Sequence, residues 1–341
     1  MFAGIARSFD LTGTTGSHGA WAAVEGLGEV AMSKATTESI IAQLGFTEEM
    51  QQLREILDSW IRGANEQIRP LLEWQFITSS KYFRPLTVFS VYRATTDEPI
   101  PNRLIYSAAV IEMMHNMTLI IDDIVDGSET RRGRPTLHCQ FGLLQALMAS
   151  GYIVADGFRM TAGDRIDIRL MSDLIKRLGA AECLQWNVRR QLLSVEDWLN
   201  IAGEDTGSMF ETCACVATRD DLLRKFGGLL GVLYHGCDDV GDVKGLESLG
   251  GGGEEDLRDG ILTLPASIAI KDPVIAKLFC KPVRSDDELA QISRAVRAAV
   301  PAAEERLDQL AAEAKWEAHL HTANPAPLYA LVEHTRELSR R

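Results

Sequence analysis

The chain has 341 residues, of which 46% are hydrophobic and 24% are charged, which is typical of a globular protein. Its formal net charge of −13 and its lack of a concentrated basic patch argue against nucleic acid or an anionic membrane as a partner. No apolar run in the sequence reaches membrane-spanning length, and the six cysteines show no paired spacing. We therefore expect a cytoplasmic protein without disulfides and without an integral membrane segment.

In chain order, the first region is rich in Gly, Ser, Thr and Ala, and we expect residues 1–40 to form an N-terminal extension and residues 41–341 to form one domain. From Thr47 the pattern is helical, because a capping residue and acidic residues precede apolar residues at helical spacing. Further helices are predicted to start near Pro101 and Pro135. Period-2 strand patterns are scarce. The sequence therefore predicts an all-α fold.

The stretch from 112 to 126 is the first that carries chemistry. It is apolar up to its acidic end, which predicts a helix buried on most sides. Asp122 and Asp126 lie one turn apart on one face, and His115 lies two turns back on that face. Ionised carboxylates are costly to bury without a cation. With the arginines of 131–134 following closely, this stretch predicts a site for magnesium and a polyphosphate.

A second stretch, residues 222–243, repeats this arrangement. It ends in acids at the same spacing, Asp238, Asp239 and Asp242. Four glycines would each weaken this helix by about 1 kcal/mol relative to alanine, so we expect them to allow close approach of a neighbouring helix: Gly227, Gly228, Gly231 and Gly236. The two stretches together predict two acidic walls that face each other across a cavity, with divalent metals and a diphosphate between them.

These motifs resemble those of the trans-isoprenyl diphosphate synthases, the polyprenyl synthase family of the class I isoprenoid synthase superfamily. Residues 122–138 are similar to the family's first aspartate-rich motif with its arginine tail, and residues 238–242 to its second. Residues 81–85 resemble its Lys-x-x-Arg-Pro signature. The resemblance covers about residues 45–341. It implies a single-domain isoprenoid synthase fold, a helical bundle around a deep central cavity, and a homodimer.

The resemblance also implies roles for individual residues. The Mg²⁺ ligands, for three ions when diphosphate is bound, would be Asp122, Asp126 and Asp238. The other catalytic carboxylates would be Asp123, Asp239 and Asp242. The allylic diphosphate would be bound by Arg131. The second, homoallylic diphosphate would be bound by Lys81, Arg84, His115 and Arg132. Substrate-binding roles are also implied for Thr206 and His235.

The implied reaction is Mg²⁺-dependent condensation of an allylic prenyl diphosphate with isopentenyl diphosphate. Metals and cations would stabilise the departing diphosphate, which can take the final proton. Met117 and Thr118 stand five and four positions before Asp122, where their side chains would form the floor of a hydrophobic tunnel. The intermediate bulk of Met117 indicates a product of about C15 to C20.

The chain departs from the family pattern at several of these positions. Asp205 replaces a lysine, Ile261 replaces a second lysine, and His235 replaces a glutamine. An anion near a phosphate oxygen is repelled by about 4 kcal/mol at an effective dielectric constant of about 20. Asp205 must therefore point away, help to ligate metal, or be neutralised, for which Arg189 and Arg190 lie near in sequence.

Three alternatives remain open. A class I terpene cyclase would ionise a prenyl diphosphate without a second substrate, but the cations expected to hold that substrate are all present. A prenyltransferase of this fold could also use another acceptor at the Lys81 and Arg84 site. A catalytically silent subunit of a heteromeric synthase is disfavoured by the intact aspartates. We expect the six tryptophans to be packing residues, and residues 254–256 to be a solvated run of acids.

Overall fold

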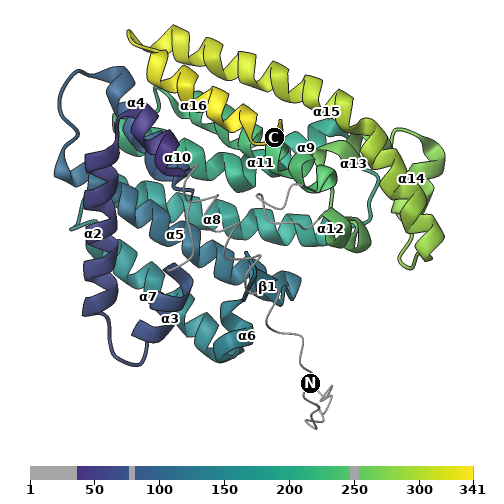
Figure 1. Ribbon diagram of the computed structural model, residues 1–341, viewed down its shortest axis with the longest axis horizontal. Coiled ribbons are helices and arrows are strands. Elements are labelled where there is room, and N and C mark those ends of the chain that lie inside the picture. Colours follow the sequence, from purple (N-terminus) through teal and green to yellow (C-terminus); the bar gives the residue numbers. More distant parts are fainter. Residues whose placement is uncertain (1–36, 77–80, 246–252, 341) are drawn as a thin grey trace.

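Helices make up nearly all the regular structure of the protein, which confirms the all-α prediction. The computed structural model describes residues 37–76, 81–245 and 253–340 (Figure 1). Residues 37–44 are helical, and Ile41 is buried in the core. The rest of the predicted N-terminal extension lies outside the described residues.

The elements that follow in chain order are α2 (Thr47–Gly63), α3 (Arg69–Phe76), α4 (Phe83–Thr95), α5 (Asn102–Asp126), β1 (Thr130–Arg131), β2 (Arg134–Pro135), α6 (Leu137–Phe141), α7 (Leu143–Met160), α8 (Arg165–Val188), α9 (Val195–Ala202), the π-helix η1 (Gly203–Gly207), α10 (Ser208–Thr218), α11 (Arg224–Lys244), α12 (Gly253–Asp259), α13 (Leu264–Ala269), α14 (Pro273–Phe279), α15 (Asp286–His321) and α16 (Ala326–Glu337).

Helix α5 runs through the bundle and packs against α2, α4, α7 and α10 (Figure 1). Its extended N-cap residue, Pro101, starts the helix as predicted, and Gly127 ends it with a φ of 66°. By length and composition alone α5 could cross a membrane, contrary to our expectation from the sequence. However, 72% of its most apolar window is buried inside the protein, as in the core helix of a globular domain.

Helix α11 lies unusually close to α10 and η1, because glycines line the contact. A Cβ atom on Gly227 would lie 2.5 Å from the carbonyl oxygen of Phe210, and one on Gly231 would lie 2.7 Å from that of Thr206. Real Cβ atoms do not approach so closely, so only glycine fits at these two positions. The prediction that these glycines serve close helix packing is confirmed. The contact fixes α11, with its aspartates, against η1.

A two-stranded hairpin follows α5 and was not predicted. Thr130 pairs with Pro135, and Arg131 with Arg134. The turn residues Arg132 and Gly133 both have positive φ, 52° and 71°, the left-handed conformation that short hairpin turns require. Arginine at the first turn position is not a usual hairpin signal, which is why the sequence did not reveal it. The hairpin directs Arg131 back toward the end of α5.

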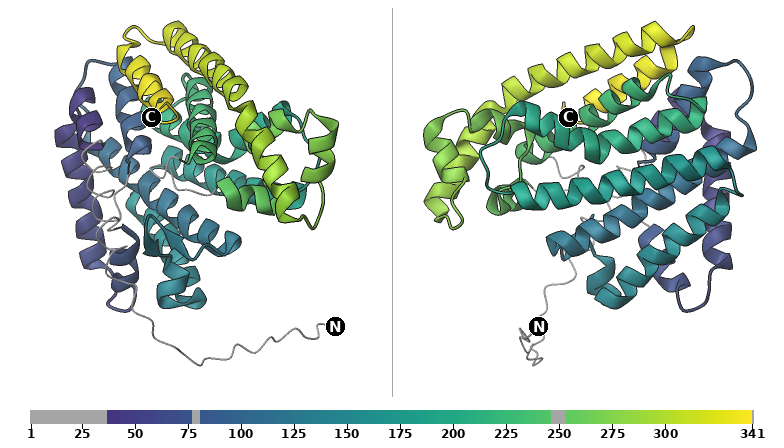
Figure 2. Two further views of the ribbon diagram at one scale, coloured as in Figure 1. Left: turned by 45° about the vertical axis from the view of Figure 1, so that its right-hand side comes forward. Right: turned by 180° about the vertical axis from the view of Figure 1, so that it is seen from behind.

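The C-terminal helices cover one side of α11. Helix α15 spans 36 residues and packs against α11, α13 and α16. Seen from behind, α15 and α16 run alongside α11 (Figure 2). The buried guanidinium of Arg336 on α16 ties these elements together, with its Nη2 2.5 Å from Glu304 Oε2 and its Nε 2.7 Å from Asp308 Oδ1 on α15. Lys244, at the end of α11, also contacts Glu304.

Candidate active site

The two aspartate motifs lie at the C-terminal ends of α5 and α11, with α10 packed against both helices. The side chain of Asp256 on α12 is influenced by carboxylates of both motifs. Burial raises the pKa of Asp256 to about 8, with further contributions from Asp239 and Asp242 of the second motif and Asp126 of the first. Carboxylates act on one another in this way only at short range. The contacts agree, because Arg189 joins Asp126 at the end of α5 to Asp259 on α12, and α12 packs against α11. The acidic ends of the two helices therefore lie near a common region.

In the first motif, two of the three aspartates already have a cation. Asp123 is buried, and its Oδ1 accepts a hydrogen bond of 2.8 Å from Arg131 Nε. Asp126 is more exposed, and its Oδ1 accepts one of 2.9 Å from Arg189 Nη2. The pKa of Asp122 is well above its usual value, because the side chain is buried and because Glu182 and Asp205 lie nearby. Of the three, Asp122 is the carboxylate that most lacks positive charge.

In the second motif, Asp239 has a structural role. Its Oδ2 accepts hydrogen bonds from Trp198 Nε1 at 2.9 Å and from the backbone N–H of Leu264 at 2.7 Å, at the start of α13. Trp198 is fully buried, as expected of a packing residue, but it also orients this aspartate. Burial raises the pKa of the neighbouring Asp238 to about 6, although Lys81 and His235 act in the opposite direction.

The π-helix η1 presents Asp205 and Thr206 to His235 on α11. The Oδ2 atom of Asp205 lies 3.4 Å from His235 Nδ1, and the Thr206 hydroxyl lies within hydrogen-bond distance of both side chains, at 3.1 and 2.9 Å. Burial opposes a charge on His235, but Asp239 and Asp205 raise its pKa to about 9. Burial also opposes the charge on Asp205, yet the contact with His235 holds its pKa below the usual value. The pair is thus an aspartate and an imidazolium.

This arrangement settles how Asp205 is accommodated. The sequence suggested Arg189 or Arg190 as its neutralising partner, and this is wrong. Arg189 contacts Asp126 and Asp259 instead, and Arg190 donates to the carbonyl oxygen of Arg258. The partner of Asp205 is His235, which lies far away in the sequence and is brought near by the close packing of α11 against η1.

The side chains predicted to bind the second diphosphate form a positively charged cluster beside these carboxylates. Burial lowers the pKa of His115 well below its usual value, and the charges of Arg84, Arg132 and Arg131 lower it further, so His115 is neutral. Arg84 lies over the ring of Phe210, 5.5 Å from its centroid. Among the described residues, His115 Nδ1 and Arg84 Nε are buried without a hydrogen-bond partner. Unpaired buried polar atoms are costly, so these two atoms would gain from a hydrogen-bonding partner.

The sequence did not place Asp256 and Glu182 in the site, and it suggested a different partner for Arg189. The interpretation of Asp256 as a solvated residue is wrong, because its side chain is half-buried and faces both aspartate motifs. Burial raises the pKa of Glu182 to about 7, together with Asp205 and Asp126. Arg189 bridges Asp126 and Asp259. Arg189 directly follows the last residue of α8, seven positions after Glu182, and this spacing of about two helical turns is the one available sequence signal.

The predicted product-length residues lie on α5, before the first motif. Met117 is buried in the hydrophobic core, with 9% of its surface exposed. The Thr118 hydroxyl donates a hydrogen bond of 2.8 Å to the carbonyl oxygen of His115. Met117 is thus among apolar neighbours, whereas Thr118 is held to its own helix.

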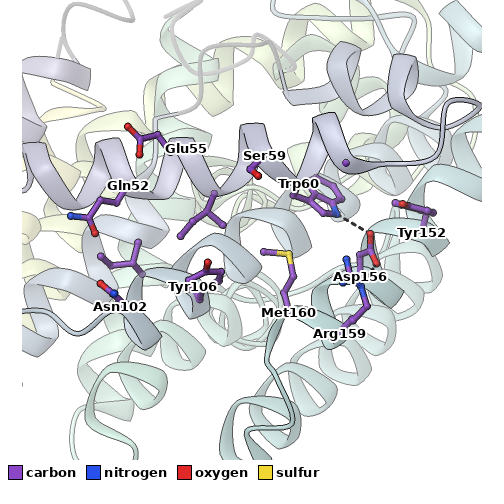
Figure 3. A pocket seen from close by; sticks show the side chains of 13 residues that line it. Gln52, Glu55, Ser59, Trp60, Asn102, Tyr106, Tyr152, Asp156, Arg159 and Met160 are labelled. Atoms are coloured by element: carbon purple, nitrogen blue, oxygen red, sulfur yellow. Dashed lines mark hydrogen bonds and ion pairs between the residues drawn. The ribbon is translucent and has the colours of Figure 1, made fainter.

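A cleft of about 540 Å³ opens elsewhere, between α2, α5 and α7 (Figure 3). Trp60 and Asp156 meet at one end of it, where the indole N–H donates a hydrogen bond of 2.9 Å to the carboxylate. The cleft is lined by none of the residues that were predicted to bind substrate or metal. It is separate from the candidate active site.

The fold and this site define a helical prenyl diphosphate enzyme, and comparison with known proteins agrees. Residues 65–298 match the family described as polyprenyl synthetase. This match covers more than half of the chain. The chain therefore belongs to the polyprenyl synthetase family and is a prenyltransferase.

Named relatives differ in the products that their names state. The nonaprenyl diphosphate synthase of Mycobacterium tuberculosis is 29% identical over 306 residues, which cover 83% of this chain and 90% of that protein. The geranylgeranyl diphosphate synthase of Sulfolobus acidocaldarius is 27% identical over 241 residues, covering 64% and 72%. A crystal structure of a polyprenyl synthase from Caulobacter crescentus, complexed with calcium and isoprenyl diphosphate, has a similar fold, with a TM-score of 0.77, 24% identity, and coverage of 89% and 98%.

Proposed function

We propose that this protein condenses an allylic prenyl diphosphate with isopentenyl diphosphate in a Mg²⁺-dependent reaction that releases a longer prenyl diphosphate. The observation that carries the proposal is the pairing of two kinds of site. Two aspartate-bearing helix ends lie near α12, because α12 packs against α11 and its Asp259 shares Arg189 with Asp126 of α5. Beside them lies the cluster of Arg84, His115 and Arg132, in which Arg84 Nε and His115 Nδ1 are buried without a hydrogen-bond partner. A single-substrate enzyme would have little use for the second cluster.

The carboxylates fit Mg²⁺, an ion that prefers hard oxygen ligands. Burial raises the pKa of Asp122 and Asp238, because a carboxylate loses hydration when it is buried, and a bound metal ion would compensate that loss. Among the described residues, no three acidic, His or Cys side chains converge enough to hold an ion alone. We infer that Asp122, Asp126 and Asp238 share three ions with the substrate's diphosphate. When bound, Mg²⁺ would stabilise the charge that develops on the departing diphosphate.

The remaining residues orient the allylic diphosphate. Arg131 would donate to it from the hairpin, held in place by Asp123, with which it forms a 2.8 Å salt bridge. His235 carries a proton at neutral pH, and Thr206 supplies a hydroxyl beside it. These donors would favour departure of diphosphate with the bonding electron pair when the allylic C–O bond breaks. Asp239 and Asp242 would act as second carboxylates around the ions.

The second substrate would bind through Lys81, Arg84, His115 and Arg132. Neutral His115 can donate one ring N–H to a phosphate oxygen, and the unpaired Arg84 Nε can donate another. The double bond of isopentenyl diphosphate would then attack the allylic carbocation. A proton lost from the new cation would pass to the diphosphate that has left, so that the reaction needs no protein base.

We propose a product of about C15 to C20, because Met117 would stand below the allylic chain and limit its growth, with Thr118 beside it. Support for a longer product comes from the relatives, since names among them extend to nonaprenyl diphosphate synthase. The bulk of Met117 favours the shorter product.

The proposal is tested by incubating the protein and Mg²⁺ with labelled isopentenyl diphosphate and each of a series of allylic donors. Labelled prenyl diphosphates longer than the donor are expected, and their length gives the product. A hydrocarbon formed from the donor alone would instead identify a terpene cyclase. Consumption of the donor without label in the product would indicate another acceptor, and a silent subunit would form nothing.

We also propose that the protein acts as a cytoplasmic homodimer. Four apolar side chains are exposed on one stretch of α7, Leu143, Leu144, Leu147 and Met148. An exposed apolar cluster of this kind is typical of a contact surface. Analytical ultracentrifugation should find a dimer, and the variant Leu144→Glu should be a monomer.

A further inference from the structure

Arg189 was considered from the sequence only as a partner of Asp205, and its position is fixed by the chain around it. Helix α8 ends at Val188, and Arg190 then turns the chain with a φ of 59°. The backbone N–H of Arg190 donates a hydrogen bond of 2.9 Å to the carbonyl oxygen of Gly260. A Cβ atom on Gly260 would lie 2.4 Å from Arg190 Cγ, so the two turns are in tight contact. The turn that carries Arg189 is thus firmly seated against the end of α12.

The guanidinium of Arg189 connects the two sides of the candidate active site. Its Nη2 lies 2.9 Å from Asp126 Oδ1 on α5, and its Nη1 lies 3.7 Å from Asp259 Oδ2 on α12. The guanidinium carbon lies 4.2 Å from the centroid of the Trp186 ring. Stacking on an aromatic ring restricts the plane of a guanidinium and therefore the directions in which its N–H groups point.

One donor of this guanidinium is not used. The side chain of Arg189 is only 13% exposed, and its Nε is buried without a hydrogen-bond partner among the described residues. A buried, charged donor without an acceptor is unfavourable by more than a neutral one. The position therefore suits a further anion that reaches Arg189 from the site.

We propose that Arg189 is a substrate-binding residue that holds the allylic diphosphate at the rim of the site. This inference rests on the proposed function. The planar guanidinium fork fits two oxygens of a phosphate as well as those of a carboxylate. Asp126 accepts a hydrogen bond of 2.9 Å from one arm of that fork, Nη2. Mg²⁺ held by Asp126 would share the charge of this carboxylate, and Arg189 would then be able to donate to the diphosphate as well.

A purely structural role is the competing explanation, because Arg189 also ties α12 to α5. The two explanations differ in what they predict for ligand affinity. Substituting a substrate-binding residue changes the affinity for diphosphate. Substituting a residue that only holds α12 in place changes the stability of α12. Lys176, on the helix that precedes Arg189, is highly exposed, with a side chain that is 77% accessible and only a 3.9 Å contact to Asp173. Lys176→Gln is therefore a matched control for the loss of one positive charge.

The test measures the binding of inorganic pyrophosphate in Mg²⁺ by calorimetry, together with the KM for each substrate, in Arg189→Gln, Arg189→Lys and Lys176→Gln. For Arg189→Gln we expect weaker pyrophosphate binding and a higher allylic KM, each by about tenfold or more, with the isopentenyl diphosphate KM unchanged. Arg189→Lys should show a smaller loss of pyrophosphate binding than Arg189→Gln, because lysine keeps the positive charge but lacks the planar guanidinium and its paired N–H donors. Lys176→Gln should behave as the unsubstituted protein does.

The inference is overturned if Arg189→Gln binds pyrophosphate and the allylic substrate normally while amide hydrogen exchange in residues 256–260 accelerates, because Arg189 is then only a structural tie. If Arg189→Gln does not fold, as judged by circular dichroism, the same measurements on Arg189→Lys decide. A protein that elongates no donor contradicts the proposed function, but pyrophosphate binding still tests Arg189 by itself.

Discussion

His235 Nδ1 lies 3.4 Å from Asp205 Oδ2, so that an anion and a cation on neighbouring helices neutralise each other inside the site. The family resemblance expects a lysine and a glutamine at these positions. One positive group is still present near the place where the diphosphate would bind. It lies on α11, at His235, and not on η1, where the family pattern has its lysine. Asp205 is therefore a partner of His235 and does not oppose the substrate directly.

Restoring a lysine at position 205 should impair the enzyme. In Asp205→Lys, two cations would meet within about 4 Å, where like charges repel by about 4 kcal/mol at an effective dielectric constant of about 20. We expect kcat/KM for the allylic substrate to fall about tenfold or more. In Asp205→Asn, which removes the anion without adding a cation, kcat/KM for the allylic substrate should fall less. Faster turnover in Asp205→Lys would show that the chain has simply lost a useful cation.

Stabilisation by Mg²⁺ should depend on pH. Burial raises the pKa of Asp238 to about 6, that of Glu182 to about 7 and that of Asp256 to about 8. The unfolded chain loses these protons near pH 4, so the stability contributed by these groups is present below about pH 4 and is lost as the pH rises toward 8. At pH 6, Mg²⁺ must also displace protons that are mostly absent at pH 8.

We therefore expect Mg²⁺ with pyrophosphate to raise Tm by at least about 2 °C more at pH 8 than at pH 6, measured by differential scanning fluorimetry. Sodium chloride at equal ionic strength controls for screening of the carboxylates. Equal shifts at the two pH values would mean that these carboxylates do not exchange protons for metal.

Removing the bulk of Met117 should lengthen the product. In Met117→Ala, the shortened side chain would open space on α5 below the allylic chain, and we expect at least one more isoprene unit in the product, as resolved by chromatography. Met117→Leu keeps a similar volume and should keep the product length. An unchanged product in Met117→Ala would remove this residue from the tunnel.

Arg336 on the C-terminal helix α16 should stabilise the packing of α16 against α15. Its side chain is 3% exposed and contacts Glu304 and Asp308. Arg336→Met would leave Glu304 without its buried partner, and we expect the free energy of unfolding to fall by about 3 kcal/mol, measured by urea denaturation. Arg340 pairs with Asp308 on the surface, where it is 51% exposed, and Arg340→Met should cost at most about 1 kcal/mol. Equal losses in both variants would contradict the burial argument.

The sequence predicted those features that depend on local patterns. Apolar periodicity and a following glycine located α5, and the glycines of α11 indicated its close packing. Contacts between residues that are distant in the sequence could not be predicted from local patterns. Nothing near Asp205 in the sequence indicates His235, and nothing near Asp256 indicates that it faces both motifs. These contacts depend on how the helices pack against one another, and that packing cannot be read from a single sequence.

The central claim is that Asp122 and Asp238, on separate helices, hold one metal–diphosphate site between them. Calorimetric titration of inorganic pyrophosphate tests this most directly, in the unsubstituted protein with and without Mg²⁺ and in Asp122→Asn and Asp238→Asn with Mg²⁺. The account predicts that binding requires Mg²⁺ and that each substitution weakens it by about tenfold or more. Binding that needs no Mg²⁺, or that survives either substitution unchanged, would contradict it.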